Sequence, residues 1–437
     1  MTNCKRQREL FQGFQGRKIE VNFEGGDVTS DGGILLIRQA DKMLGLTERA
    51  SGFLADPRRR KSCIHEVLDM LRQRVYGICQ GYEDLNDHDH LKTDIAFQTA
   101  VDRDRPLASS PTLCRFESRM DRAVAFKLNE LFVDTFIESH RYPLEEMILD
   151  FDATDDPVHG NQEGRFFHGY YDHYCFLPLY VFSGHHLLCA MLRPSNIDPA
   201  KHAWAVLKLL VAKLRKAWPE VQIIFRGDSG FCRHKMMNWC DKHGIGYVIG
   251  IVRNPRLEAM SSRIMRKAEK QCRRTGRKAK LYTEIWYAAE TWKYKRCVIV
   301  KAEYTSQGRN PRYIVTNLPG TPQWIYESLY CARGDMENRI KEKQLDLFAD
   351  RTSCHHWWPN QFRLLLSSLA YVLMEAIRRL GLHGTELASA QCGTIRLKLL
   401  KIGAVIIRNT RRIRFLLSSH YPWQHLFIIA AQRLNTS

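Results

Sequence analysis

The feature that most restricts the fold of this chain is a regular exchange of strand and helix patterns between residues 141 and 252. Short apolar runs of strand length lie in this block, at 147–152, 174–182, 187–192, 221–225 and 244–252. An amphipathic helix spans about 204–218, and a shorter helix precedes the last run. Because strands and helices alternate, we expect an α/β fold with a mixed sheet flanked by helices.

The flanking segments follow different patterns. The N-terminal part reads as mostly helical after a strand-like start at Lys18–Phe23, where apolar and polar side chains alternate. A basic, β-rich stretch follows the core block, then helix returns, and a basic segment ends the sequence. We therefore expect an N-terminal region, a core in two parts separated by an insertion, and a C-terminal region, with bounds 1–140, 141–252, 253–320, 321–385 and 386–437.

Positive charge is concentrated in a few segments. The chain has 66 Lys and Arg against 47 Asp and Glu, a formal net charge of +19. Residues 253–280 hold eleven basic side chains against Glu258 and Glu269, residues 396–414 hold seven with no acid, and Arg58–Lys61 form a shorter run. A single run is usually a solvated helix face, whereas three favour phosphate contact. We expect a nucleic-acid partner, bound in part by the helical N-terminal region.

Several other classes are disfavoured. No run of about 18 apolar residues exists to span a bilayer, and the first ten residues lack the apolar stretch of a secretory signal. The 13 cysteines include no C-x-x-C pair and read as reduced thiols. No phosphate-binding loop motif of the ATP-binding type is present. The sequence predicts a cytoplasmic protein without a membrane partner.

Two aspartates lie where strands of the predicted sheet end. Asp152 ends the first strand, with Asp150 on the same face because side chains alternate along a strand. Asp228 follows the buried run at 221–225. Ligands of open α/β sheets bind at the carboxyl ends of strands, although a carboxylate there is also a common turn former.

A third acid, Glu337, lies on a predicted helix. Tyr330 and Arg333 precede it by seven and four residues, which places all three on one helix face. Taken alone, Glu337 reads as a surface helix residue paired locally with Arg333 or Lys341. Together with the two strand-end aspartates in a basic chain, it fits phosphodiester chemistry, in which two divalent cations activate the hydroxyl and stabilise the leaving oxygen. Mg²⁺ takes oxygen ligands, so a few carboxylates suffice.

At these positions the sequence resembles the DDE-type transposases of bacterial insertion sequences. The motif Asp-x-Thr at a strand end matches Asp152-Ala153-Thr154, and Asp-x-Gly-Phe matches Asp228-Ser229-Gly230-Phe231. The family's Tyr, Arg and Glu at relative positions 0, 3 and 7 match Tyr330, Arg333 and Glu337. The resemblance covers about residues 145–380 and implies an RNase H-like core interrupted by a β-strand insertion.

The resemblance leaves two assignments open. The family signature places a phosphate-binding Lys seven residues after the Glu, where this chain has Gln344, so Lys341 or Lys343 is the candidate. Asp150 competes with Asp152 for the first metal position, and the threonine register favours Asp152. In some relatives an insertion-domain Trp holds a flipped base; Trp286 and Trp292 are the candidates here, although a core role fits them better.

The resemblance implies a DNA transposase. It would bind the terminal inverted repeats of its element as a homodimer, cut there, and join the 3′ hydroxyls to target DNA. Asp152, Asp228 and Glu337 would hold two Mg²⁺, which Mn²⁺ could replace, while Tyr330, Arg333 and a nearby lysine would bind phosphates. A DNA-binding regulator or inactive transposase copy is the alternative, and a structure-selective nuclease with the same core is a third.

Overall fold

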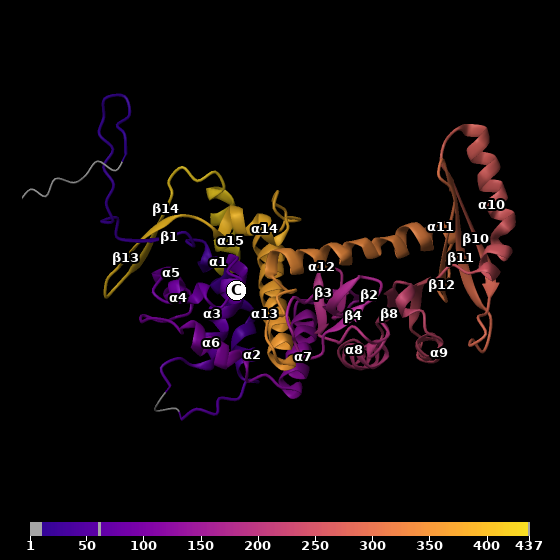
Figure 1. Ribbon diagram of the computed structural model, residues 1–437, viewed down its shortest axis with the longest axis horizontal. Coiled ribbons are helices and arrows are strands. Elements are labelled where there is room, and N and C mark those ends of the chain that lie inside the picture. Colours follow the sequence, from indigo (N-terminus) through magenta and orange to yellow (C-terminus); the bar gives the residue numbers. More distant parts are fainter. Residues whose placement is uncertain (1–10, 60–62, 436–437) are drawn as a thin grey trace, which may run out of the picture.

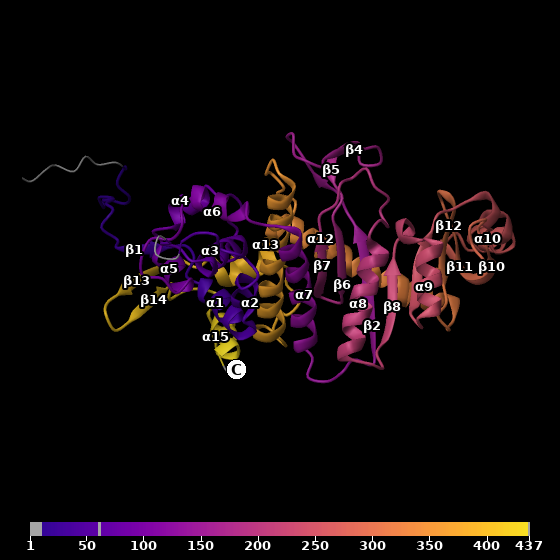
Figure 2. The same cartoon turned by 90° about the horizontal axis from the view of Figure 1, so that it is seen from below.

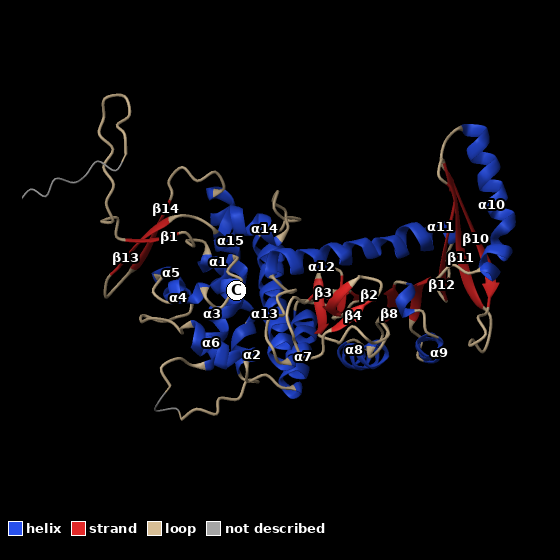
Figure 3. Cartoon of the chain, viewed as in Figure 1, coloured by secondary structure: helices blue, strands red, loops and turns tan. Residues whose placement is uncertain are grey.

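The computed structural model describes residues 11–59 and 63–435, so Arg60 and Lys61 of the short basic run lie outside the described residues. The molecule is elongated, with a helical body at one end, a large sheet in the middle, and a long helix against the far end of that sheet (Figures 1 and 3). The expected mixed α/β architecture is confirmed.

The central sheet has the strand order β10-β11-β12-β9-β8-β2-β6-β7. Its strands are β2 (Glu146–Ala153), β6 (Leu179–Ser183), β7 (His186–Met191), β8 (Gln222–Gly227), β9 (Gly246–Ile251), β10 (Ala279–Tyr287), β11 (Arg296–Thr305) and β12 (Gly308–Thr316). β2, β8 and β9 run parallel, and every other neighbouring pair is antiparallel. The carboxyl ends of β2 and β8 therefore lie next to each other.

Both faces of this sheet are covered by helices. On one face, α8 (Ala203–Ala217) and α9 (His234–Lys242) pack against the strands in a core that includes Leu207, Met237 and Phe225. On the other face, Ile224, Val248 and further strand residues pack against the helical segment around Ile325. Strands buried on two faces read as nearly continuous apolar runs, which is the pattern the sequence shows.

The basic insertion extends this sheet. Residues 253–280 begin with α10 (Pro255–Thr275), whose start is fixed by Pro255 and by the Asn254 side chain, which accepts a bond from the Leu257 amide at 3.0 Å. The helix ends at Gly276, where φ is +65°. Strands β10 and β11 follow, and β12 pairs with core strand β9. The insertion is thus joined to the core by backbone hydrogen bonds.

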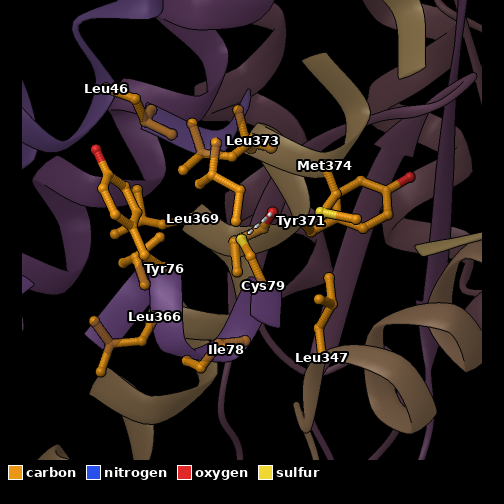
Figure 4. Packing of buried hydrophobic residues seen from close by; sticks show 14 of the residues in the cluster. Leu46, Tyr76, Ile78, Cys79, Leu347, Leu366, Leu369, Tyr371, Leu373 and Met374 are labelled. Atoms are coloured by element: carbon orange, nitrogen blue, oxygen red, sulfur yellow. Dashed lines mark hydrogen bonds between the residues drawn. The ribbon is translucent and has the colours of Figure 1, made fainter. Parts of the chain in front are cut away.

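The helical body combines the two ends of the chain. It contains α1 (Ile34–Leu44), α2 (Leu46–Ser51), α3 (Val67–Gln80), α4 (Asp87–Leu91), α5 (Ile95–Ala100), α6 (Ser110–Glu117), α7 (Arg122–Glu138), α13 (Trp357–Ala376), α14 (Cys392–Ile395) and α15 (Gln424–Asn435). Its core runs through α3 and α13, where Tyr76, Leu369 and Leu373 are fully buried (Figure 4). Figure 2 shows α13 and α7 between the remaining helices of this body and the sheet. None of the helices in the described ranges has the length and apolar character needed to cross a membrane.

Two smaller sheets correct expectations from the sequence. The apolar run 174–182 is not one strand: β5 (His173–Phe176) pairs with β3 (Asp156–Pro157) and β4 (Phe166–His168), whereas β6 starts after Pro178. Proline lacks an amide for the ladder and ends the pairing.

The second small sheet joins the ends of the chain. Its order is β1 (Asp27–Thr29), β13 (Ala404–Arg408), β14 (Ile413–Leu417). The strand expected at Lys18–Phe23 is wrong, because that segment has no regular secondary structure and belongs to none of the sheets of the described chain.

A nearly continuous helical run crosses the sheet. It comprises α11 (Pro322–Trp324), a π-helical segment η3 (Ile325–Tyr330), a short 3-10 turn η4 (Cys331–Arg333) and α12 (Gly334–Leu347). Figure 1 shows it running from the insertion towards the helical body. The irregular turns fall immediately before the predicted catalytic glutamate, and such irregularities are frequent at functional sites.

Candidate active site

The two aspartates of β2 have different environments. Asp150 is buried, and Arg226, its neighbour in register on β8, donates to it through Nη2 at 2.7 Å. Asp152 lies at the end of the strand, 15% exposed, where its Oδ1 accepts a bond from the amide of Ala153 at 3.0 Å. Asp150 is thus neutralised inside the sheet, while Asp152 faces the helical run that carries Arg333.

Asp228 follows the adjacent strand β8 directly. It caps the short 3-10 turn Ser229–Phe231 (η2), and its Oδ1 accepts a bond from the amide of Gly230 at 2.9 Å. This bond fixes one carboxylate oxygen of Asp228. Since β2 and β8 are parallel neighbours, Asp152 and Asp228 lie at the same edge of the sheet.

Arg333 connects Asp152 with Glu337. Its guanidinium forms an ion pair with Glu337 one helical turn later and lies 3.7 Å from Asp152 Oδ1 through Nη1. Arg333 therefore links Asp152 with Glu337, although Glu337 remains 43% exposed and Arg333 only 18%. Asp228 has no ion pair with Arg333 in the described residues, but it lies near enough to raise the pKa of Asp152.

The electrostatics of Asp152 reflect this crowding. Burial raises the pKa of Asp152 to about 6; the Arg333 guanidinium opposes the rise, and the Asp228 and Glu337 carboxylates add to it. Burial also acts to lower the pKa of Arg333, but Asp152 and Glu337 outweigh burial and raise it. A buried carboxylate with a raised pKa beside like charges is typical of functional sites.

Close backbone packing positions Tyr330 beside these acids. A Cβ atom added to Gly250 of β9 would lie 2.7 Å from the Tyr330 hydroxyl and 2.8 Å from the Ser229 amide. Gly250 therefore permits both Tyr330 and the loop after Asp228 to approach β9. No sequence signal marked Gly250, because it lies within an ordinary apolar strand.

The candidate lysines have opposite environments. Lys341 is exposed on α12, one turn after Glu337. Lys343 is fully buried, with its Nζ 4.6 Å from the centre of the Tyr180 ring, and burial lowers its pKa to about 7. In this conformation the Lys343 ammonium cannot reach a bound phosphate.

Gln344 links α12 to the segment that follows β2. Its amide donates to the carbonyl oxygen of Asp155 and to Asp156 Oδ1, each at 3.0 Å. The Asp155 carboxylate is also 2.9 Å from His173 Nε2. Nothing in the sequence spacing of Asp155 and Asp156 indicates this contact with α12.

Some residues of the basic clusters stabilise the fold, and others are exposed at the surface. In residues 396–414, Arg396 donates to the carbonyl of Cys79 at 2.8 Å and Lys401 pairs with Asp31 at 2.7 Å, so both stabilise the helical body. The four arginines of the β13–β14 hairpin remain exposed. On α10, Arg263, Arg266, Lys267 and Lys270 are also exposed and have no ion-pair partner in the described part of the chain.

The two tryptophans of the insertion differ. Trp292 is partly buried and packs edge-on against Tyr287 at 5.5 Å, as a core residue would. Trp286, for which a core role was also preferred, is 60% exposed, so that expectation is wrong. It lies on β10, which is an edge strand of the central sheet in the described part of the chain.

The donor set is compatible with a hard divalent cation. Asp152, Asp228 and Glu337 supply only carboxylate oxygens, the ligand type that Mg²⁺ prefers. In the described residues, however, no three His, Cys, Asp or Glu side chains are close enough to hold a metal as they stand. Arg333 pairs with Glu337 and approaches Asp152, so it occupies the role of counter-ion to both acids.

Comparison with known proteins identifies the family of this chain. The sequence matches the family model described as transposase DDE domain group 1 over residues 11–437. No curated protein matches the chain. Among solved structures, it is similar to a piggyBac transposase in a synaptic complex with hairpin DNA, with 11% sequence identity and a TM-score of 0.45 over 93% of this chain and 82% of that one. Because the family model spans nearly the whole chain, the protein belongs to the DDE transposase family, in domain group 1.

Proposed function

We propose that this transposase cuts DNA at the terminal inverted repeats of an insertion sequence and joins the 3′ hydroxyls to target DNA. The observation that carries the proposal is that acids from separate parts of the sequence lie near one another. Arg333 links Asp152 with Glu337, and Asp228 follows the strand beside that of Asp152. The proposal includes an RNase H-like core; the mixed sheet, with β6 and β7 antiparallel to the parallel strands β2, β8 and β9, supports it.

DNA contact is proposed for the exposed basic surfaces. The unpaired cations of α10 and the arginines of the β13–β14 hairpin lie at opposite ends of the elongated molecule (Figure 1). A duplex bound along the chain would therefore meet positive charge on both sides of the carboxylates. Each Lys or Arg that contacts a phosphate releases condensed counterions, so affinity should fall steeply as salt rises.

Asp152, Asp228 and Glu337 are the residues that would hold Mg²⁺, or Mn²⁺ in its place. When bound, two such ions would activate the attacking hydroxyl and stabilise the leaving oxygen. The protein itself holds the ligand side chains in place. The Gly230 amide fixes the Asp228 carboxylate, and Arg333 neutralises Glu337. Arg333 must release Glu337 before that carboxylate can bind a cation, and its guanidinium is then available for a DNA phosphate.

Phosphate contacts near the acids are proposed for Tyr330, Arg333 and Lys341. Lys341 is favoured over Lys343 because it is exposed one turn after Glu337, whereas Lys343 is enclosed in the core. Gln344 is held by the Asp155 backbone and takes no part.

A cleavage assay with two alanine variants tests the proposal. Asp228→Ala should bind the element ends with unchanged affinity in a gel-shift assay but should neither nick nor join them in Mg²⁺. Glu220→Ala is the matched control, since Glu220 is an exposed acid that precedes β8, at the opposite end of the strand from Asp228. Cleavage by Asp228→Ala at the control rate would contradict the assignment.

A DNA-binding protein without catalytic activity is the second candidate. The Arg333–Glu337 ion pair and the Gln at position 344 favour it, because the first occupies a proposed ligand and the second replaces the family lysine. In the same assay it predicts that the wild-type chain binds the repeats and does not cut them in either metal.

A further inference from the structure

Two side-chain contacts join the last part of the helical run to the chain around the end of β2. In the first, Arg333 links Asp152 with Glu337. In the second, the Gln344 amide donates to two acceptors in the segment that follows β2. Glu337 and Gln344 are two helical turns apart on α12, so they lie on nearly the same face of the helix, roughly 10 Å from each other. The second contact therefore holds the helix face of Glu337 against the segment that continues from Asp152.

The acceptors of the Gln344 amide are held in place by the small sheet. Asp156 starts β3 and pairs with Phe176 of β5 in antiparallel register, and the Asp155 carboxylate lies 2.9 Å from Nε2 of His173 on the same strand. The Asp156 side chain is fully buried, and burial raises its pKa to about 8, so its carboxyl is mostly uncharged at neutral pH. Gln344 is thus bonded to a neutral acceptor on a paired strand.

Other buried side chains of α12 contact different parts of the molecule. Glu342 forms an ion pair with Arg378 and accepts a bond from the Cys392 amide, which attaches α12 to the helical body. The Lys343 ammonium lies 4.6 Å from the centre of the Tyr180 ring, which belongs to β6. In the described ranges, the hydrogen bonds between α12 and the segment after β2 come from Gln344.

The two contacts differ in what happens when the acids bind a cation. Arg333 must release Glu337 before that carboxylate can act as a ligand, so the first contact is lost at that point. The Gln344 contact involves neither Glu337 nor Asp152, so it can persist after the release. It is then the contact that keeps the two carboxylates at a fixed separation.

We propose that Gln344 is a positioning residue, which keeps Glu337 beside Asp152 after Arg333 has released it. Groups that are ordered in advance bind more tightly, and a misplacement of about 1 Å at a reacting centre can cost on the order of 100-fold in rate. The inference rests on the part of the proposed function that assigns a divalent cation to the acids. It gives position 344 a role within the protein, in contrast to the phosphate contact of the family lysine.

Direct binding of Mn²⁺ tests this role without a cleavage reaction. Electron paramagnetic resonance of free Mn²⁺ measures the affinity, and the binding that is lost in Asp228→Ala defines the site of the acids. Gln344→Met keeps the length of the side chain and removes both donated bonds, so it should weaken this binding about tenfold. Gln323→Met is the matched control, because the exposed Gln323 also donates a bond, of 2.9 Å to Glu327, in the same helical run. Its Mn²⁺ affinity should be unchanged.

A change at the acceptor provides a second variant. Asp156→Asn keeps the oxygen that accepts from Gln344 and leaves the side chain uncharged, so it should bind Mn²⁺ as tightly as the wild type. In the cleavage assay, Gln344→Met should raise the Mn²⁺ concentration that gives half of the maximal rate, with unchanged affinity for DNA. A purely structural loss would instead lower the rate by the same factor at every Mn²⁺ concentration.

Three results would overturn the proposal. The first is equal Mn²⁺ affinity of Gln344→Met and Gln323→Met, and the second is a loss in Asp156→Asn as large as that in Gln344→Met. The third is a lower maximal rate of Gln344→Met with an unchanged half-saturating Mn²⁺ concentration. A wild type that binds Mn²⁺ at the acids but cuts no DNA would contradict the proposed function alone, since the Mn²⁺ affinities still decide the role of Gln344. A wild type that binds no Mn²⁺ there would contradict both.

Discussion

Replacing Asp152 with Asn should stabilise the metal-free protein at neutral pH. Burial and the neighbouring acids raise the pKa of Asp152 to about 6, against an ordinary value of 3.8 for an aspartate in the unfolded chain. A carboxyl with a raised folded-state pKa resists ionisation, so its ionisation costs stability as the pH rises through 6. At 1.36 kcal/mol per pKa unit the cost at pH 7.5 is about 3 kcal/mol.

The gain in stability of Asp152→Asn should depend on pH. At pH 4.5 the folded carboxyl is protonated and the unfolded one mostly ionised, so the advantage of Asn should shrink to about 1 kcal/mol. Arg333 keeps Glu337 as a partner in the variant, which limits the compensating loss. Urea denaturation in the presence of a chelator, at pH 7.5 and pH 4.5, measures both values.

Asp150→Asn is the matched control two residues away. Asp150 is paired with Arg226 inside the sheet, so its loss leaves a buried guanidinium without a counter-charge and should destabilise the fold by on the order of 3 kcal/mol. The reasoning would be refuted if Asp152→Asn destabilised the protein at pH 7.5, or if its effect were the same at both pH values.

Three further perturbations have outcomes set by the same contacts. Gly250→Ala should reduce cleavage at least tenfold with little change in DNA affinity, because the added methyl meets the Tyr330 hydroxyl, whereas Gly169→Ala, which has nothing within 4 Å, should be silent in the same assay. Burial lowers the pKa of Lys343 to about 7, so Lys343→Met should raise the free energy of unfolding at pH 7. Thermal melts should show that this gain shrinks towards pH 10, because the unfolded lysine also loses its charge there. Arg266→Gln on α10 should lower the slope of log affinity against log salt by about one if the side chain contacts a phosphate; an unchanged slope in titrations at several salt concentrations would remove α10 from the DNA surface.

The sequence alone predicted most of the local elements and the candidate acids. Apolar runs placed β2, β8 and β9 to within a few residues, because a buried strand must be apolar on both faces. Strand ends and helical spacing selected Asp152, Asp228 and Glu337, since those positions follow from periodicity within one element. The same local logic failed at 174–182, where Pro178 divides two sheets, and at Lys18–Phe23, a segment that alternates in sequence but is not a strand in the structure.

Tertiary structure decided everything that depends on residues far apart in the chain. Asp150 and Asp152 are equivalent in sequence, and only the parallel register with Arg226 separates a neutralised acid from one that faces Arg333. Lys341 and Lys343 are likewise separated only by the direction in which α12 turns them. Burial and pairing are properties of the packed neighbourhood, and contacts such as that between β1 and β13 join positions that no local pattern connects.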